Sequence, residues 1–495
     1  MTDLVLLTLV VAYVAASLGL FVYGTNWYYL TYRWLRLRKT ARADTRIRGD
    51  FPHVTVQIPV YNERYVVGRL LEAVAAFDWP RDRLEIQILD DSEDDTTEIL
   101  RPLVEGLRAR GVDVVHVRRT RRDAYKAGAL AAGLARARGE FLAIFDCDFV
   151  PGRDFLRRVM GAFDDPSVGF VQARWGHLNR GFSLLTAAQA TGIDGHFAVE
   201  QDARARSGFL MNFNGTAGVW RRACIEDADG WQGDTLAEDL DLSYRAQLRG
   251  WRGVYAKDVV CAAELPVQLA AFKRQQFRWA RGSFQVFLKL RTAIARAGLR
   301  PLARFQAYVH LSLYAVHPLM LASFLLLPPL MLSRALDPIV PAAFAMASLG
   351  PASMYVASQI EFAPADWRRH ILVLPFLTAL GMGQCLNNSR AVVGAVLRRP
   401  SPFLRTPKFG IEGRQGTWRG SRYALRSGWE PFGELALGAY GVGATGLAIA
   451  AGNLWPILWM GFFTAGFLLV GALSLWHTTT VRRARPEGIE DAATA

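Results

Sequence analysis

Cysteine is scarce in this sequence. The 495 residues include four cysteines, Cys147, Cys224, Cys261 and Cys385, and no two of them form a CxxC pair. Disulfide-stapled domains and structural zinc sites both need closely grouped cysteines. We therefore expect neither, and isolated thiols of this kind fit a reducing compartment such as the cytoplasm.

Acidic residues are also in deficit, with 44 Asp and Glu against 58 Lys and Arg, a formal net charge of +14. No zinc-finger or aromatic RNA-binding signature accompanies this charge, so we expect no nucleic-acid partner. The basic residues gather beside apolar runs, as they do in cytoplasmic loops of membrane proteins. The two main groups are Arg33, Arg36, Arg38, Lys39, Arg42, Arg46 and Arg48, and Arg398, Arg399, Arg405, Lys408, Arg414, Arg419, Arg422 and Arg426.

Charge is missing altogether from several long stretches. Residues 4–32 carry no charged side chain, which is enough helix to cross a hydrocarbon core of about 30 Å. A signal peptide would have a basic start, which this run lacks, so we interpret it as an anchor with its C-terminal end in the cytoplasm. Further uncharged stretches cover 305–333, 338–360, 371–389 and 435–480.

If every uncharged stretch crossed the membrane, the basic segment 398–430 would lie outside the cell. The stretch 371–389 is interrupted by Pro375, Gly381 and several polar side chains, so we expect 361–397 to be an interfacial or re-entrant helix. Five spans remain in a multi-pass protein of, we expect, the bacterial inner (plasma) membrane. The predicted organisation is a transmembrane helix at 1–32, a basic linker at 33–50, a cytoplasmic domain at 51–304, two transmembrane helices in 305–360, the interfacial or re-entrant helix at 361–397, a cytoplasmic basic segment at 398–432, two transmembrane helices in 433–477 and a cytoplasmic tail at 478–495.

The cytoplasmic domain reads as an α/β fold. Four strand-like runs, at 53–59, 84–89, 112–117 and 141–145, alternate with amphipathic helical patterns. Such alternation predicts a mostly parallel sheet flanked by helices. Ligands of these sheets bind beyond the carboxyl ends of the strands, so the polar residues that follow each run are the candidate site.

Acidic residues follow two of these runs. Asp90 and Asp91 come after the second run, and Asp146 and Asp148 come after the fourth. Carboxylates separated by one residue can bind a hard divalent cation that also bridges a diphosphate. A solvated turn is the ordinary reading of any single DxD triplet, but its place directly after an apolar strand favours a site.

Each of the further candidate site residues has a functional and a structural interpretation. Lys126 begins a helix of small residues, where it could reach a phosphate or could be a surface lysine. Glu238 and Asp239 begin another helix, either as caps of its N-terminus or with one of them as the general base of a transfer reaction.

A last group, Gln275, Arg278 and Trp279, precedes the second apolar stretch. Arginine can neutralise a diphosphate bidentately, and an indole can stack on a sugar ring. An Arg-Trp pair close to a membrane is also a common interfacial anchor.

Taken in order, these residues resemble the D, DxD, [T]ED, QxxRW pattern of processive family-2 glycosyltransferases. Within that family the chain is most similar to the cellulose synthase-like A and C proteins, the mannan or glucomannan synthases and β-glucan synthases, and to their bacterial relatives. The stretches that carry the resemblance are 56–63, 78–83, 87–92, 125–128, 145–149, 171–175, 212–221, 238–242 and 275–279. The resemblance implies an α/β GT-A glycosyltransferase domain inserted in an α-helical transmembrane bundle.

The resemblance also implies roles for individual residues. Asp239, beside Glu238, would be the catalytic base, with Ala237 in place of the family's threonine. The stretch 403–408 is similar to the FxVTxK gating loop of cellulose synthases, with Arg405 in place of valine. The other implied roles are nucleotide-sugar binding by Asp90 or Asp91, Lys126, Asp146, Arg278, Thr406 and Lys408; Mg²⁺ or Mn²⁺ binding by Asp148 and Asp146; and acceptor binding by Trp279, Gln275, Asn214, Gly215 and Thr216.

The expected activity is inverting, processive polymerisation of a β-linked hexose polysaccharide, with translocation across the lipid bilayer. The donor would be GDP-mannose or UDP-glucose, with a slight preference for mannose, and the acceptor would be the growing polysaccharide. One alternative is a non-processive enzyme that adds a sugar to a membrane lipid. A remote one is an inactive scaffold, which predicts damage at acidic positions that are intact here. We expect no cyclic-di-GMP-binding domain after the last span.

Overall fold

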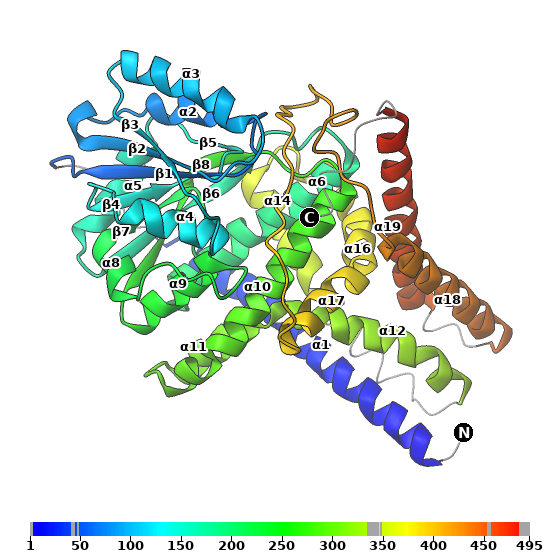
Figure 1. Cartoon of the computed structure of the whole chain (residues 1–495). Helices are drawn as coiled ribbons and strands as arrows, with labels where there is room; N and C mark the ends of the chain where they lie inside the picture. Colours follow the sequence, from blue (N-terminus) through cyan, green and yellow to red (C-terminus); the bar gives the residue numbers. More distant parts are fainter. Residues whose placement is uncertain are drawn as a thin grey trace.

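The computed structural model describes residues 3–40, 45–46, 49–333, 346, 349–452 and 457–484. An α/β domain packs beside a group of long apolar helices, and the mostly non-helical segment 397–429 runs between the two (Figure 1).

The α/β domain is built on one eight-stranded sheet with the order β3-β2-β1-β4-β7-β6-β8-β5. Strands β1 to β4 pair in parallel and coincide, within two residues at either end, with the four predicted runs. The α/β prediction is therefore confirmed. The strands are β1 (Val54–Val60), β2 (Leu84–Asp90), β3 (Val114–Arg118), β4 (Phe141–Ile144), β5 (Phe149–Val150), β6 (Val168–His177), β7 (Gly218–Arg221) and β8 (Arg252–Ala263).

Both faces of the sheet are covered by helices, so its central strands are almost wholly buried and rich in Val, Ile and Leu. Leu70 of α2 and Leu100 of α3 pack with Val56 on one face, and Leu130 of α4 packs with Leu142 on the other. The helices of this domain are α2 (Val67–Ala75), α3 (Thr96–Ala109), α4 (Tyr125–Leu134), α5 (Phe155–Val159), α6 (Leu184–Gly195), the π-helix η3 (His196–Glu200), α7 (Gln201–Ser207), α8 (Arg222–Asp227), α9 (Glu238–Leu248) and α10 (Leu269–Arg296), with the 3₁₀ turns η1 (Arg81–Arg83) and η2 (Met160–Asp164).

Four helices in the described part of the chain are long and apolar enough to cross a membrane, which is the character of a membrane protein. They are Asp3–Leu37, Leu313–Leu332, Glu430–Ala450 and Ile457–Val481. The remaining elements are α1 (Asp3–Leu37), α11 (Pro301–Leu311), η4 (Leu313–Ala315), α12 (Val316–Leu332), α14 (Gly350–Phe362), α15 (Trp367–His370), η5 (Ile371–Val373), α16 (Leu374–Gly383), α17 (Cys385–Val396), α18 (Glu430–Ala450) and α19 (Ile457–Ala484).

The segment predicted to be interfacial or re-entrant forms two helices bent by 43°, Trp367–Gly383 and Cys385–Val396, which together could make a fifth span. The predicted span at 338–360 lies partly outside the described residues, and most of its described part falls in α14.

The first helix is longer than the predicted span. It continues to Leu37 because Leu30 and Trp34 are buried against Ala198 and Val199 of the α/β domain. One helix therefore joins the apolar group of helices to the α/β domain.

Helices α16 and α19 touch through glycine. A methyl group at Gly383 would lie 2.2 Å from the backbone oxygen of Gly466, whereas one at Gly381 would meet nothing within 4 Å. Small residues allow such close backbone contact between membrane helices.

We predict that Gly383→Ala lowers the thermal unfolding midpoint of the detergent-solubilised protein, by an overpacking cost of about 1–3 kcal/mol. Gly381→Ala, on the same helix, should leave the midpoint unchanged or raise it slightly, because alanine favours a helix over glycine. Equal midpoints for both variants would contradict the close contact between α16 and α19.

Candidate functional site

A cavity of about 190 Å³ opens at the carboxyl ends of β1, β2, β4, β6 and β8, and we call it the acidic cavity. Its place is the one expected for ligands of such a sheet. Thirteen residues singled out from the sequence line it: Asp91, Lys126, Asp146, Asp148, Asn214, Gly215, Glu238, Asp239, Gln275, Arg278, Trp279, Thr406 and Lys408.

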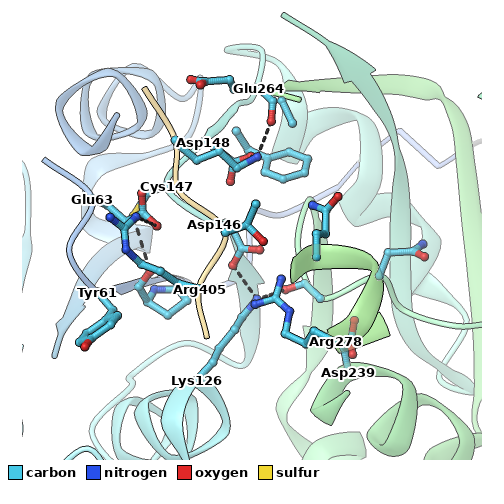
Figure 2. Close-up of a pocket in the computed structure, with 18 of the residues that line it drawn as sticks. Tyr61, Glu63, Lys126, Asp146, Cys147, Asp148, Asp239, Glu264, Arg278 and Arg405 are labelled. Atoms are coloured by element: carbon cyan, nitrogen blue, oxygen red, sulfur yellow. Dashed lines mark hydrogen bonds and ion pairs between the residues drawn. The ribbon is translucent and has the colours of Figure 1, made fainter. Parts of the chain in front are cut away.

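Two lysines neutralise the two aspartates that follow β4. Lys126 of α4 lies 2.5 Å from Asp146, and Lys408 of the segment 397–429 lies 2.6 Å from Asp148 (Figure 2 shows the lysine of α4 pointing to its partner). Burial alone would lower the pKa of Lys126, but Asp146 and Glu238 outweigh it and raise that pKa. Lys126 therefore stays charged at the centre of the cavity.

Asp239 lies in the first turn of α9, beside Lys126. Burial, and then the neighbouring Glu238 carboxylate, raise the pKa of Asp239 to about 7. Gly215, at φ +80°, lies against it: a methyl group there would be 2.9 Å from Asp239 Oδ2 and 3.4 Å from Lys126 Nζ. Only glycine fits this contact without strain, so the 214–216 loop and the carboxylate are in direct contact.

The structure separates Asp90 from Asp91. Asp90 is buried and accepts hydrogen bonds from the Ser92 amide and Thr97, and with His116 these outweigh burial and lower its pKa. Asp91 instead lines the cavity. Thr216, like Asp90, does not line it; its hydroxyl accepts from the backbone N–H of Asp146 at 2.8 Å and so orients that residue.

The segment 397–429 lies across the cavity and brings an aromatic ring into it. Phe403 stacks on Tyr125 with ring centroids 5.5 Å apart, and the Arg278 guanidinium sits 4.5 Å from the centre of the Phe403 ring. The ring centroids of Trp279 and Trp175 lie 6.5 Å apart, and the two rings are tilted by 50°. Aromatic faces next to charged groups are suited to holding a sugar beside a phosphate.

Sequence reasoning missed Glu63. This carboxylate follows β1, is 16% exposed and pairs with Arg405 at 3.3 Å. Burial raises the pKa of Glu63 to about 7, although Arg405 lowers it. The signal was available, because the residue lies within the 56–63 stretch, just after a strand. The arginine that departs from the FxVTxK pattern thus has a partner in the cavity.

Glu264 was also missed, and it anchors the same segment. Its carboxylate accepts hydrogen bonds from the backbone N–H groups of Phe409, Gly410 and Ile411 at 2.8, 2.9 and 3.1 Å. Lys408 donates to the Glu264 backbone oxygen. Such charge-assisted bonds are stronger than neutral ones, so this side chain helps to hold the segment over the cavity, together with the Arg405 and Lys408 ion pairs.

A second cavity, of about 420 Å³, adjoins the first and shares Trp175, Asn214, Asp239 and Trp279 with it. We call it the inner cavity. It extends between helices of the apolar group, where its lining includes Trp27, Tyr314, His317, Tyr355, Gln384 and Asn388. It offers polar and aromatic surface that begins at Asp239.

Within the described residues, no group of three His, Cys, Asp or Glu side chains could hold a metal ion unaided. Asp146 and Asp148 supply the carboxylate oxygens that hard divalent cations prefer, but each already faces a lysine. A cation would therefore fit here only if a bound ligand supplied further oxygens, as a diphosphate can.

Two family models match the chain. The one described as glycosyltransferase like family 2 matches residues 52–282, and the one described as cellulose synthase matches residues 224–349. A mannosyltransferase from Pyrobaculum calidifontis, solved in complex with GDP-Man and Mn²⁺, aligns with 79% of this chain and all of its own, at a TM-score of 0.53 and 23% identity. That likeness supports the GT-A fold.

Curated relatives extend the comparison. Probable glucomannan 4-β-mannosyltransferase 7 of Oryza sativa subsp. japonica is 44% identical over 248 residues, 49% of this chain and 42% of that protein. The matched part thus spans less than half the length of this relative. Glucomannan 4-β-mannosyltransferase 1 of Cyamopsis tetragonoloba is 33% identical over 455 residues, 86% of this chain and 82% of the relative.

We predict that Glu264→Ala speeds hydrogen exchange at the amides of Phe409, Gly410 and Ile411 by roughly tenfold or more, because three bonds to a charged acceptor are lost. Glu264→Gln keeps a neutral acceptor, so its exchange rates at these amides should lie between those of the native protein and those of Glu264→Ala. Glu105→Ala, at an exposed position on α3, is the control. Unchanged exchange in Glu264→Ala would show that the segment is held by other contacts.

Proposed function

Because the chain belongs to glycosyltransferase family 2, together with the glucomannan 4-β-mannosyltransferases of plants, we propose that it polymerises a β-linked hexose polysaccharide by inverting, processive transfer. The donor is a nucleotide sugar, and GDP-mannose is preferred to UDP-glucose. This preference is supported by the names of the plant relatives and by the GDP-Man in the archaeal complex.

The observation that carries the proposal is the position of Asp239. It is a half-buried carboxylate with a raised pKa, next to Lys126, and it lines the same cavity as the two aspartates that follow β4. A general base works best when its pKa lies near the working pH. The acidic cavity thus holds a base beside a charged surface for a diphosphate, which is the pair of features that glycosyl transfer needs.

In the proposed reaction, Asp239 takes the proton of the acceptor hydroxyl. The hydroxyl oxygen forms a bond to the anomeric carbon on the face opposite the diphosphate. The bond between that carbon and the diphosphate oxygen breaks, and its electron pair stays on the diphosphate. An α-linked donor therefore gives a β-linked product.

Cationic side chains offset the charge of the leaving diphosphate. Lys126 and Arg278 line the cavity from α4 and α10, and Thr406 and Lys408 reach it from the segment 397–429. At comparable sites one such donor contributes about 2.7–4 kcal/mol to the transition state. Asp146 and Asp148 would hold a divalent cation, Mg²⁺ or Mn²⁺, together with diphosphate oxygens, and the cation would neutralise further charge there.

Processive synthesis needs the product to stay bound, and the inner cavity supports this part of the proposal. It begins at Asp239 and Trp279 and continues between apolar helices. Gln275 and Trp279 would hold the acceptor end of the chain at its entrance. The growing polysaccharide would leave through it, across the lipid bilayer of a bacterial inner membrane.

The orientation follows from charge. The basic residues after the first apolar run and those of 398–430 would both lie on the cytoplasmic side with the α/β domain. Nucleotide sugars would then reach the acidic cavity directly from the cytoplasm.

Replacing Asp239 by Asn should reduce polymer synthesis by at least about 10²-fold, because general bases contribute about 10²–10⁴-fold. Donor affinity, measured by titration of the purified protein, should stay within a few-fold of the native value. Asp82→Asn is the matched control, since its side chain is 79% exposed. Near-native polymer synthesis by Asp239→Asn would rule out Asp239 as the base.

A further inference from the structure

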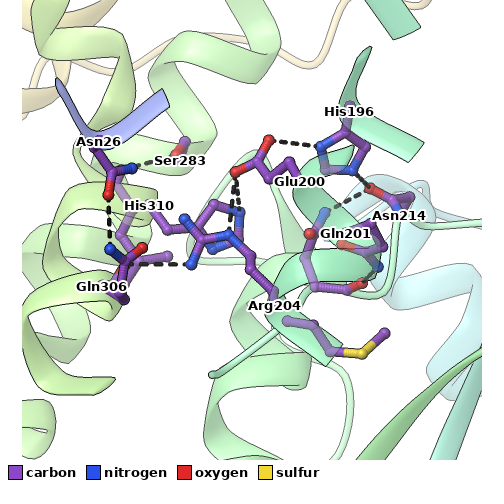
Figure 3. A network of polar contacts seen from close by, with 12 residues as sticks. Asn26, His196, Glu200, Gln201, Arg204, Asn214, Ser283, Gln306 and His310 are labelled. Carbon is purple, nitrogen blue, oxygen red and sulfur yellow. Dashed lines mark hydrogen bonds and ion pairs between the residues drawn. The ribbon is translucent and has the colours of Figure 1, made fainter. Parts of the chain in front are cut away.

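A largely buried polar network lies along the inner cavity, between the acceptor side of the acidic cavity and the first membrane helix (Figure 3). Apart from Asn214, its residues have no role in the reaction described above. Its members are Asn26, His196, Glu200, Arg204, Asn214, Tyr244, Gln306 and His310.

One end of the network is the Asn214 side chain, which lines both cavities. Its Oδ1 accepts from Asn212 Nδ2 at 2.5 Å and lies 3.2 Å from His196 Nε2. Its Nδ2 is buried and has no hydrogen-bond partner in the part of the chain that the structure describes. An unsatisfied buried N–H group is costly, and because Asn214 lines both cavities, a small turn of its side chain would let Nδ2 donate to the oxygen of a bound ligand.

His196 sets the orientation of that amide. Its Nδ1 lies 2.9 Å from Glu200 Oε2, and its Nε2 faces Asn214 Oδ1. Both ring nitrogens therefore lie within hydrogen-bond distance of an oxygen atom. The π-helix His196–Glu200 carries both members of the first pair, and such distortions occur frequently at functional sites.

Glu200 is held in turn. Its Oε1 accepts from Arg204 Nε at 3.1 Å, and both side chains are buried. Arg204 donates to the Gln306 backbone oxygen at 3.3 Å, and the Gln306 side chain donates to Asn26 of α1 at 2.6 Å. A buried ion pair adds little net stability once desolvation is included. The position of the Glu200–Arg204 pair beside His196 fits another role, which is to hold the His196 ring in one orientation.

The network also lies close to the helix of the catalytic base. His310 is 2.6 Å from the hydroxyl of Tyr244 in α9 and 3.9 Å from Glu200 Oε1, which is beyond hydrogen-bond distance. Only the Tyr244–His310 hydrogen bond among these contacts therefore reaches the helix that carries Asp239.

We propose that His196 is a positioning residue for the transfer step. Held by Glu200 and Arg204, it fixes the Asn214 amide so that Nδ2 is presented to a hydroxyl group of the acceptor sugar beside Asp239. The inference rests on the proposed function, because it requires a sugar acceptor bound beside Asn214 and Asp239.

The test compares His196→Phe and His196→Gln with the native protein, and His53→Gln, at an exposed position before β1, is the control. Three quantities are measured on purified protein in lipid vesicles: sugar incorporated into polymer, nucleoside diphosphate released by hydrolysis of the donor with water, and donor affinity. We expect His196→Phe to lose roughly tenfold in polymer synthesis, with hydrolysis and donor affinity unchanged. His196→Gln, which keeps one donor, should lose less.

A double mutant tests whether His196 acts through Asn214. If it does, His196→Phe should cost nothing further in a chain that already carries Asn214→Ala, because the two losses are not independent. Additive losses would contradict the proposal. So would a parallel fall in hydrolysis, donor affinity and polymer synthesis, which indicates a merely structural role.

Two further outcomes are distinguishable. If the native protein makes no polymer, the proposed function itself fails. If it makes polymer and both His196 variants match it within twofold, the function stands and the positioning role is wrong. Should His196→Phe not fold, as judged by its thermal unfolding, His196→Gln alone and with Asn214→Ala decides the question.

Discussion

The arrangement of the site depends on charge compensation between carboxylates and cations from distant parts of the chain. Glu63, Asp146, Asp148, Glu238 and Asp239 all line one cavity, where like charges would repel strongly in a medium of low dielectric constant. Lys126 of α4 forms an ion pair with one of these carboxylates, and Arg405 and Lys408 of the segment 397–429 form ion pairs with two others. Because these pairs join the α/β domain to that segment, the segment lies over the cavity. In the proposed reaction the donor diphosphate would bind to these same cationic side chains.

The same constraint explains what could be predicted from the sequence. Strands β1, β2 and β4 are buried on both faces and rich in Val, Ile and Leu, which made them recognisable as strands, and the acidic residues after them mark the edge where ligands bind. Strands β6 and β8 carry Arg174, His177, Lys257 and Asp258 among their apolar residues and gave no comparable signal. The mixed half of the sheet, β7-β6-β8-β5, was therefore not predicted.

Local sequence patterns could not predict the contacts between residues that are far apart in the sequence. The Glu63–Arg405 pair and the hold of Glu264 on the segment join positions that only the folded chain brings together. The choice between Asp90 and Asp91 depended on which side chain turns inward at the end of β2, and the sequence left it open. Charge patterns located the segment 398–430, but its path across the cavity follows from these pairings.

The central claim is that the acidic cavity transfers mannosyl units repeatedly onto one growing chain. The most direct measurement incubates the purified protein in vesicles with labelled GDP-mannose or labelled UDP-glucose and then digests the product with a β-mannanase or a cellulase. The account predicts that label from GDP-mannose enters a long polymer that the mannanase degrades. Label that stops at a single sugar on a lipid, or enters polymer only from UDP-glucose, would contradict it.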